Sequence, residues 1–469
     1  MSSKKQINMS LIKSISGIRG TIGGRPDQNL TPLDVVQFAS AYGTWINQKF
    51  PNKKNKVCVG RDARISGQMI QNIVQNTLVG LGIDVVNLDL STTPSVEMAV
   101  TGLQADGGII LTASHNPKQW NALKLLNENG EFLSAKEGEL LLDLIAKNDY
   151  NYAEVDDLGE IYDYPNGFID EHILLILALD EVDVDAIKKM NYTVAIDAIN
   201  STGGIAIPKL LDKLGVQYEC MFCDVSGDFQ HNPEPLEKNL QDIIAKVGEM
   251  KADLGIIVDP DVDRLALIDE NAKMIGEEYT LAVVADYILA NTKGNTVSNL
   301  SSSRVLKDIS DKYGVQYSKA KTGEVNVVAK MRETNAIIGG EGNGGVIFPK
   351  LHAGRDSLLG IALVLTYMAK SGKTLSELKG GYPQYFMSKN KMEITTNFDL
   401  SKVVDHFANK YKDAEIDTQD GLRVDFDDSW LQVRTSNTEP IVRIYTEALS
   451  QEKADALAAK TIDELKGFL

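Results

Sequence analysis

Short runs of apolar residues recur along the chain, separated by longer segments whose apolar positions lie three or four residues apart. Residues 107–111, 254–258 and 336–338 are such runs, and each is followed by a polar or glycine-rich loop. Apolar runs of this length, bounded by turn residues, are typical of buried strands. In the segment 236–247 the apolar side chains instead fall on one face, which predicts an amphipathic helix.

The predicted strands form a repeat. Each of the three runs is preceded by another predicted strand, at residues 56–59, 192–196 and 295–298. Strands that alternate with amphipathic helices predict mixed α/β domains with largely parallel sheets. The length of 469 residues agrees with this interpretation, because roughly 150 residues per domain would give about three domains.

The loop after the first run carries a candidate nucleophile. Ser114 lies in the sequence Thr-Ala-Ser-His-Asn-Pro at residues 112–117. A hydroxyl at a strand end stands on a rigid support, and α/β proteins bind phosphate where strand ends lead into polar loops and helix starts. A lone serine of this kind is more often a loop residue that caps a helix, so the chemical interpretation needs partners.

Three aspartates follow the second run. Asp259, Asp261 and Asp263 are spaced two residues apart, so their carboxylates can converge on one hard cation, for which Mg²⁺ is the best fit. Together with Glu270 they match four ligand positions of an EF-hand. Arg264, however, stands where that loop needs glycine, and the flanks are typical of strands. A solvated acidic turn is the other alternative.

Two further loops carry polar side chains suited to a small ligand. The glycine-rich loop at 339–345 formally satisfies a dinucleotide-binding pattern, but no helix pattern follows it. Its Glu341 and Asn343 can hydrogen-bond ligand hydroxyls, and a plain hairpin is the alternative. The loop after the predicted strand 430–433 could clamp a phosphate or form an ordinary hairpin turn. Its candidate donors are Arg434, Ser436, Asn437, Thr438 and, beyond the loop, Arg443.

Charge and composition exclude several classes of partner. The net charge of −17 argues against nucleic-acid or anionic-membrane partners, and no run is long and apolar enough to span a bilayer. No secretory pattern begins the chain. An anionic substrate therefore needs a local basic site. The candidate cations for it are Arg19, Lys124, Arg264, Arg434 and Arg443.

The cysteines indicate a reducing compartment. Cys220 and Cys223 form a C-x-x-C pair, but no second pair completes a zinc site and no helix begins there, as a redox motif requires. We interpret them, with Cys58, as thiols of strands and strand ends, and we expect a cytoplasmic protein.

In this order the four loops resemble one family, the α-D-phosphohexomutases, which include phosphoglucomutase, phosphomannomutase and phosphoglucosamine mutase. The resemblance covers essentially the whole chain. It also takes in the motifs at residues 16–20, 59–67, 92–94 and 231–235. Within the family the chain is most similar to bacterial phosphoglucosamine mutases, in the group with Glu-Gly-Asn-Gly-Gly in the sugar loop.

The resemblance implies an α/β fold of four domains, in which three similar mixed α/β domains precede a smaller C-terminal α+β domain. We expect a phosphoserine domain at 1–155, a metal-loop domain at 156–273, a sugar-loop domain at 274–373 and a phosphate-binding domain at 374–469.

The resemblance also implies the chemistry, in which a phosphoryl group moves between the 6 and 1 positions of a hexose through a phosphoserine and a bisphosphorylated sugar. Ser114 would carry the phosphate, and it would share Mg²⁺ with Asp259, Asp261 and Asp263. Lys124 would act as a general base or acid, or as a plain phosphate-pairing cation, and His115 and Arg264 would lie beside the transferring phosphate. Substrate contacts would come from Arg19, Glu341, Asn343, Arg434, Ser436, Asn437, Thr438 and Arg443. The expected partners are a phosphorylated hexose or hexosamine and a hexose 1,6-bisphosphate activator, and the protein would be a monomer or a homodimer.

Some positions depart from the family pattern. Asn343 stands where many members have serine, Gly345 where some have histidine, and Asn437 where many have glycine. Glu324 occupies a position that is histidine in some phosphomannomutases and aspartate in many phosphoglucosamine mutases. An acid there could meet a 2-ammonium group, which favours a glucosamine substrate. The alternatives are a phosphoglucomutase/phosphomannomutase of broad specificity, a Mg²⁺-dependent sugar phosphatase and an inactive binding protein.

Overall fold

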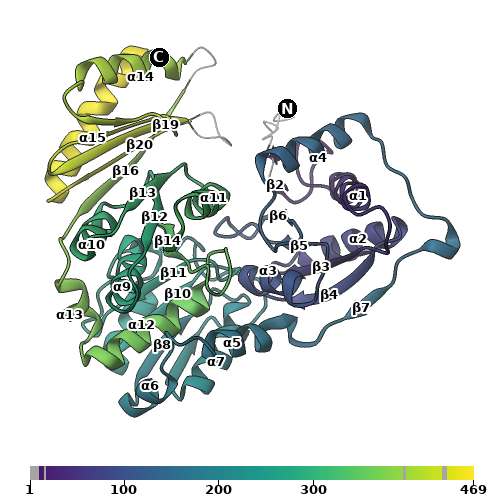
Figure 1. Cartoon of the computed structure of the whole chain (residues 1–469), viewed down its shortest axis with the longest axis horizontal. Helices are drawn as coiled ribbons and strands as arrows, with labels where there is room; N and C mark the ends of the chain where they lie inside the picture. The colour runs from purple at the N-terminus through teal and green to yellow at the C-terminus, as the bar shows by residue number, and fades with distance from the viewer. Residues whose placement is uncertain (1–9, 15–16, 395–397, 436–440, 469) are drawn as a thin grey trace, which may run out of the picture. The chain divides into compact units, whose positions relative to one another are not determined.

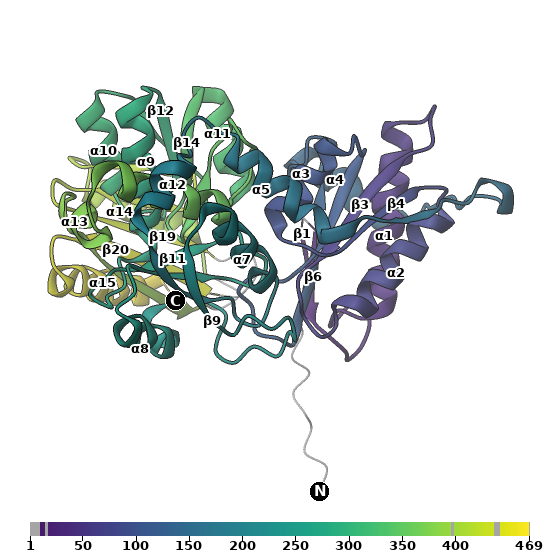
Figure 2. The ribbon, with the colours of Figure 1, turned by 90° about the horizontal axis from the view of Figure 1, so that it is seen from below.

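The computed structural model describes residues 10–14, 17–394, 398–435 and 441–468. The chain divides into two compact units. The first unit comprises Met1–Thr280 and Gly345–Ser376, and the second comprises Leu281–Gly344 and Glu377–Leu469. Figure 1 labels the helices and strands, and Figure 2 shows the same ribbon from below.

A seven-stranded mixed sheet forms the N-terminal part of the first unit, in the order β1-β2-β6-β5-β3-β4-β7. Its strands are β1 (Ile12–Ser14), β2 (Gly17–Thr21), β3 (Lys56–Arg61), β4 (Asp84–Leu90), β5 (Gly107–Leu111), β6 (Trp120–Leu126) and β7 (Ile161–Asp163). The accompanying helices are α1 (Pro32–Lys49), α2 (Gly67–Gly80), α3 (Thr93–Gly102) and α4 (Ala135–Lys147).

Alternate residues of this sheet enter two different cores. Val57 and Val59 of β3 pack in the core that contains α1, α2 and α4, whereas Cys58 between them packs in the core that contains α3. In β5, Ile109 and Ile110 divide between the two cores in the same way. Successive side chains of a strand point to opposite faces, and both faces are covered here, so these strands are continuous apolar runs.

The rest of the first unit is built around a four-stranded sheet in the order β11-β10-β8-β9. Its strands are β8 (Thr193–Asp197), β9 (Gln217–Met221), β10 (Leu254–Val258) and β11 (Leu265–Ile268). The other elements of the first unit are α5 (Ile169–Leu177), α6 (Val184–Met190), α7 (Gly203–Leu214), α8 (Gln241–Met250), α12 (Ser357–Ser371), β15 (Gly345–Ile347) and the 3₁₀ turns η1 (Val155–Asp157), η2 (Pro165–Phe168) and η3 (Glu237–Asn239).

In the second unit, β12 (Asn295–Asn299) pairs in parallel with β13 (Tyr317–Ala320) and with β14 (Ala336–Glu341). An antiparallel sheet follows, in the order β16-β20-β19-β18-β17. Its strands are β16 (Phe386–Glu393), β17 (Glu415–Asp417), β18 (Leu422–Asp425), β19 (Ser429–Thr435) and β20 (Ile441–Ala448). The remaining helices are α9 (Glu277–Asn291), α10 (Val305–Tyr313), α11 (Glu324–Thr334), α13 (Leu375–Gly380), α14 (Leu400–Lys410), α15 (Gln451–Leu465) and the turn η4 (Lys466–Phe468).

The predicted mixed α/β class is confirmed, and so is the predicted placement of the cysteines in strands and at a strand end. Cys58 lies in β3, Cys220 in β9 and Cys223 just beyond β9, and all three are free thiols. Among the described residues, no helix combines the length and the apolar character that crossing a membrane requires.

Candidate active site

The serine loop joins β5 to β6, two antiparallel neighbours, so a strand follows the loop instead of a helix. The Ser114 hydroxyl donates a hydrogen bond of 2.6 Å to Asp259 Oδ2, and His115 Nδ1 lies 3.4 Å from the same hydroxyl. Ser114 has a backbone φ of +48°, a left-handed conformation that is uncommon for residues other than glycine. The surrounding contacts therefore hold the serine in a conformation that it rarely adopts alone.

The aspartate loop joins β10 to β11, which are also antiparallel. Asp259, Asp261 and Asp263 are fully buried, and each offers a carboxylate oxygen within 4.8 Å of the other two. The backbone N–H groups of Asp263 and Arg264 donate to Asp259 Oδ1 at 3.2 and 3.1 Å. Val262 has a φ of +64°, a strained conformation for a β-branched residue, and such strain clusters at functional sites.

The chemistry of this carboxylate group fits a hard cation. Asp261 Oδ1 and Asp263 Oδ1 are buried and accept no hydrogen bond from the residues that the structure describes. Buried acceptors without a partner are costly, and an oxygen-only donor set suits Mg²⁺. Burial raises the pKa of Asp259 well above its ordinary value, and the neighbouring carboxylates of Asp263 and Asp261 raise it further. A bound cation would offset both effects.

Basic side chains surround the carboxylates. Lys124 Nζ lies 2.7 Å from Asp261 Oδ2 and 3.5 Å from Asp263 Oδ2, and Arg355 donates to Asp263 Oδ2 at 2.7 Å. Burial by itself lowers the pKa of Lys124, but Asp261 and Asp263 more than offset this, so the pKa is raised. Lys124 is therefore held as an ammonium ion in this arrangement.

The pKa of His115 is shifted in the opposite direction from that of Lys124. Burial lowers the pKa of His115 well below its ordinary value, and the positive charges of Arg264 and Arg19 lower it further. The imidazole is therefore neutral and can accept as well as donate a hydrogen bond. Arg19 contacts the same loop, because its Nη1 donates to Asn116 Oδ1 at 3.2 Å. The structure thus brings together the predicted site residues of the first unit.

Sequence reasoning missed two contacts of this site. Arg355 precedes α12 and pairs with Asp263, 92 positions earlier in the chain. No motif of the sequence pointed to it. Thr93 donates to Asp261 Oδ2 at 2.6 Å, and it lies inside the Thr92-Thr93-Pro94 motif, which could have indicated it.

The predicted sugar-contacting residues of the second unit lie close to one another. Glu341 Oε1 accepts hydrogen bonds from Asn299 Nδ2 at 2.7 Å and from the backbone N–H of Gly323 at 2.9 Å. Asn343 Nδ2 lies 3.4 Å from Glu341 Oε2. Glu324 follows Gly323 as the first residue of α11 and is buried. The Glu341 and Asn343 side chains therefore meet where β14 ends, and Glu324 is the chain neighbour of Gly323, whose N–H contacts Glu341.

Arg434 and Arg443 come from neighbouring strands of the C-terminal sheet. They are opposite residues in the β19–β20 ladder. Arg434 Nε is buried and donates no hydrogen bond to the residues that the structure describes. The other predicted clamp residues, Ser436, Asn437 and Thr438, lie outside the described residues.

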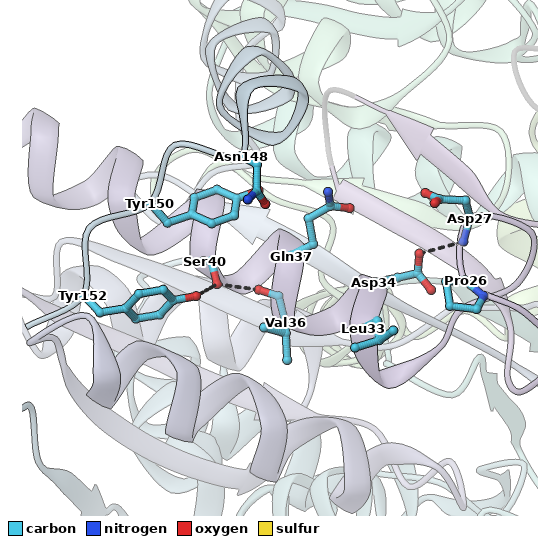
Figure 3. A pocket seen from close by; sticks show the side chains of 10 residues that line it. All are labelled: Pro26, Asp27, Leu33, Asp34, Val36, Gln37, Ser40, Asn148, Tyr150 and Tyr152. Carbon is cyan, nitrogen blue, oxygen red and sulfur yellow. Dashed lines mark hydrogen bonds between the residues drawn. The ribbon is translucent and has the colours of Figure 1, made fainter.

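A pocket of about 470 Å³ in the first unit is lined by residues outside the serine and aspartate loops (Figure 3). Residues of α1 and of the segment after α4 line it, among them Asp34, Ser40 and Tyr152. Ser40 and Tyr152 are joined there by a hydrogen bond of 2.7 Å between their hydroxyl groups. No predicted site residue lines this pocket.

Comparison with known proteins shows the family to which the chain belongs. Four sequence models of the phosphoglucomutase/phosphomannomutase family match the chain: α/β/α domain I over residues 11–152, domain II over 170–274, domain III over 277–386 and the C-terminal domain over 391–464. They confirm the predicted architecture of three α/β domains and a C-terminal domain. The boundaries expected near residues 155, 273 and 373 stay predictions.

Individual relatives match over nearly their whole length. A phosphoglucomutase/phosphomannomutase of Thermococcus kodakarensis is 37% identical over 96% of this chain and 99% of its own. A phosphoglucosamine/phosphogalactosamine mutase of Sulfurisphaera tokodaii is 30% identical over 98% of this chain and 99% of its own. The crystal structure of a family protein from Burkholderia thailandensis superimposes with a TM-score of 0.84 at 26% identity, covering 98% of both chains. The chain therefore belongs to the phosphoglucomutase/phosphomannomutase family and is a phosphohexomutase.

Proposed function

We propose that this phosphohexomutase is a phosphoglucosamine mutase, which interconverts glucosamine 6-phosphate and glucosamine 1-phosphate. One observation carries the phosphoryl transfer in this proposal: the Ser114 hydroxyl lies 2.6 Å from Asp259, inside a group of three converging buried carboxylates. A phosphate on this hydroxyl would bring an oxygen to the same place as the three acids. Shared coordination of a cation by carboxylates and a phosphate is typical of phosphoryl-transfer sites.

In this proposal Asp259, Asp261 and Asp263 hold Mg²⁺ together with a phosphate oxygen on Ser114. The ion, when bound, supplies positive charge that stabilises the transferring phosphoryl group. Arg264 and the neutral His115 lie beside that group and donate hydrogen bonds to it. Because its pKa is raised, Lys124 fits the role of a phosphate-pairing cation better than that of a resting general base.

Each phosphoryl transfer in this proposal proceeds without release of inorganic phosphate. The bond between phosphorus and Ser114 Oγ breaks, a bond forms to the free hydroxyl oxygen of the sugar phosphate, and the proton of that hydroxyl is released as Ser114 regains one. The bisphosphorylated sugar then turns over and returns its other phosphate to Ser114 by the reverse step. Arg434 and Arg443, with Ser436, Asn437 and Thr438, hold whichever phosphate is not reacting, while Arg19 pairs with the anion near the serine loop.

The choice of glucosamine rests on Glu324. This buried acid adjoins the Gly323–Glu341 contact, among residues suited to reading sugar hydroxyls. A carboxylate there would pair with a 2-ammonium group but has no charge partner in a 2-hydroxyl group. The second candidate is a mutase of broad specificity for glucose and mannose phosphates, and the relative from Thermococcus kodakarensis favours it.

A coupled assay tests the proposal. Purified protein with Mg²⁺ and a trace of hexose 1,6-bisphosphate, which keeps Ser114 phosphorylated, is given glucosamine 6-phosphate, glucose 1-phosphate or mannose 1-phosphate. We expect the highest kcat/KM for the glucosamine ester. Comparable turnover of the glucose or mannose esters would establish the broad-specificity enzyme. Stoichiometric release of inorganic phosphate without isomerisation would identify a phosphatase and overturn the proposal.

A further inference from the structure

Arg64 is a buried arginine that contacts the main chain of the serine loop at four points. Its Nη2 donates to the carbonyl of Asn116 at 2.7 Å and also to the carbonyl of Ser114. Its Nη1 donates to the carbonyls of Pro117 and Trp120 at 2.8 and 3.0 Å. The side chain has no exposed surface, so water does not compete for these bonds.

Asp62 completes this arrangement. Its Oδ2 accepts hydrogen bonds from Arg64 Nε at 2.9 Å and from the Thr112 hydroxyl at 2.7 Å. The Thr112 oxygen in turn accepts the backbone N–H of Ser114 at 2.9 Å. Both main-chain polar groups of Ser114 are therefore tied to the Asp62–Arg64 pair, one directly and one through Thr112.

These contacts explain how the loop keeps its conformation. Ser114 has a φ of +48°, and the carbonyls of Ser114, Asn116 and Pro117 lie between β5 and β6, where no sheet ladder fixes them. In a trans peptide the carbonyl and the next N–H point in opposite directions. The Ser114 carbonyl accepts a hydrogen bond from Arg64, so the N–H of His115, which belongs to the same peptide group, points away from Arg64.

The same segment also reaches the aspartate loop. The backbone N–H of Ala63 donates to Ser201 Oγ at 3.2 Å, and Ser201 Oγ donates to the carbonyl of Pro260 at 2.6 Å. Pro260 lies between the first two metal-loop aspartates. Residues 62–64 are therefore connected on one side to Ser114 and on the other to the chain that carries Asp259.

We propose that Arg64 is a positioning residue for phosphoryl transfer, which sets the place of Ser114 Oγ relative to Asp259 without touching the substrate. The inference rests on the proposed function. Lysine keeps the charge beside Asp62 but lacks the planar fork that serves four carbonyls, so Arg64→Lys isolates the positioning role. A misplacement of about 1 Å at a reacting atom costs about 100-fold in rate.

The test compares wild-type protein with Arg64→Lys and Thr112→Val, the second of which removes only the hydroxyl that links Asp62 to Ser114. We expect kcat to fall about 100-fold in Arg64→Lys and about 10-fold in Thr112→Val, with KM little changed. Hydrogen exchange of a peptide covering residues 112–120 should become faster in both. Ile70→Val, a buried core change in α2, is the control, and it should lower Tm without either effect.

The outcomes separate this inference from the proposed function. Unchanged loop exchange in both variants, or a change in KM alone, would overturn the positioning role. Should Arg64→Lys fail to fold, Thr112→Val decides the question by the same criteria. Absence of mutase activity in the wild-type protein would contradict the proposed function, and the exchange measurement would still decide whether Arg64 holds the serine loop.

Discussion

Arg434 and Arg443 stand directly opposite each other on β19 and β20, as Cα partners in an antiparallel ladder. Residues opposite each other in such a ladder point to the same face, and like charges in that position destabilise the pair. A phosphate between the two guanidinium groups would remove the repulsion and accept charge-assisted hydrogen bonds from both. The proposed phosphate site is compatible with this ladder register.

Replacing Arg434 by Gln should raise KM for the sugar phosphate about 10-fold or more, because one charge-assisted hydrogen bond is worth about 1.5–3 kcal/mol. Inorganic phosphate should raise Tm of the wild-type protein and have a smaller effect on the variant. Arg25→Gln, which removes an exposed arginine of the first unit, is the control and should leave both quantities unchanged. Equal phosphate effects on Tm in all three proteins would contradict an anion site at Arg434.

The parts of the fold that sequence could predict are those set by local pattern. The apolar run 107–111 is β5 at Gly107–Leu111, and the run 254–258 is β10 at Leu254–Val258. Both strands are buried on two faces, so every residue is apolar and the run ends where the strand ends. The helix expected at 236–247 instead begins at Gln241, because η3 takes up Glu237–Asn239.

The contacts that sequence could not predict join residues far apart in the chain. The local pattern around His172 indicates an ordinary helix residue, but its Nε2 lies 2.8 Å from Asp356 Oδ2, 184 positions away. Arg355 and Arg64 likewise find their partners only when separate segments pack together. A charged side chain at one position does not indicate which distant group it meets, so such pairs need the tertiary structure.

The proposed cation site predicts opposite effects on stability for two of its aspartates. Asp259→Asn should stabilise the metal-free protein at pH 8, because it removes a carboxylate whose pKa is raised by burial and by the neighbouring carboxylates of Asp263 and Asp261. Asp261→Asn should destabilise it, because Lys124 and Thr93 lose a charged partner. Urea denaturation measures both effects.

Added Mg²⁺ supplies the second readout for the same pair. Saturating Mg²⁺ should stabilise the wild-type protein, by about 2.7 kcal/mol at 100 times Kd, and it should stabilise both variants less. Ca²⁺ at the same ionic strength controls for screening and selectivity. Identical stabilisation of wild type and variants would show that these carboxylates do not bind the ion.

A buried histidine should make stability depend on pH. His352 Nε2 lies 3.3 Å from Asp356 Oδ2, and its Nδ1 lies 3.3 Å from Glu97 Oε2. Burial lowers the pKa of His352, but the carboxylates of Asp356 and Glu97 more than offset this and raise it to about 10 from 6.5. The imidazolium thus stabilises the fold fully below about pH 6.5, and this contribution is lost as pH rises through 10.

We therefore expect His352→Gln to cost about 3 kcal/mol of unfolding free energy at pH 6, with a smaller difference from wild type at pH 8 and the smallest at pH 10. Urea denaturation at these three pH values gives the difference directly. His406→Gln is the matched control, since His406 is 45% exposed, and its effect should stay within about 0.5 kcal/mol. A difference that does not shrink with rising pH would mean that the imidazolium is not the stabilising species.

Glu324 should determine whether the enzyme prefers the glucosamine ester or the glucose ester. If its carboxylate pairs with a 2-ammonium group, Glu324→Gln should lower kcat/KM for glucosamine 6-phosphate about 10-fold or more, because loss of a charge-assisted hydrogen bond is worth at least about 1.4 kcal/mol. Turnover of glucose 1-phosphate should change little, since a 2-hydroxyl group bonds the amide as well as the acid. Glu333→Gln, on the exposed side of the same helix α11, controls for the loss of one negative charge. Equal losses of kcat/KM for both sugar phosphates would leave Glu324 with a structural role. A general distortion of the sugar loop would not distinguish the substituents at carbon 2 of the sugar.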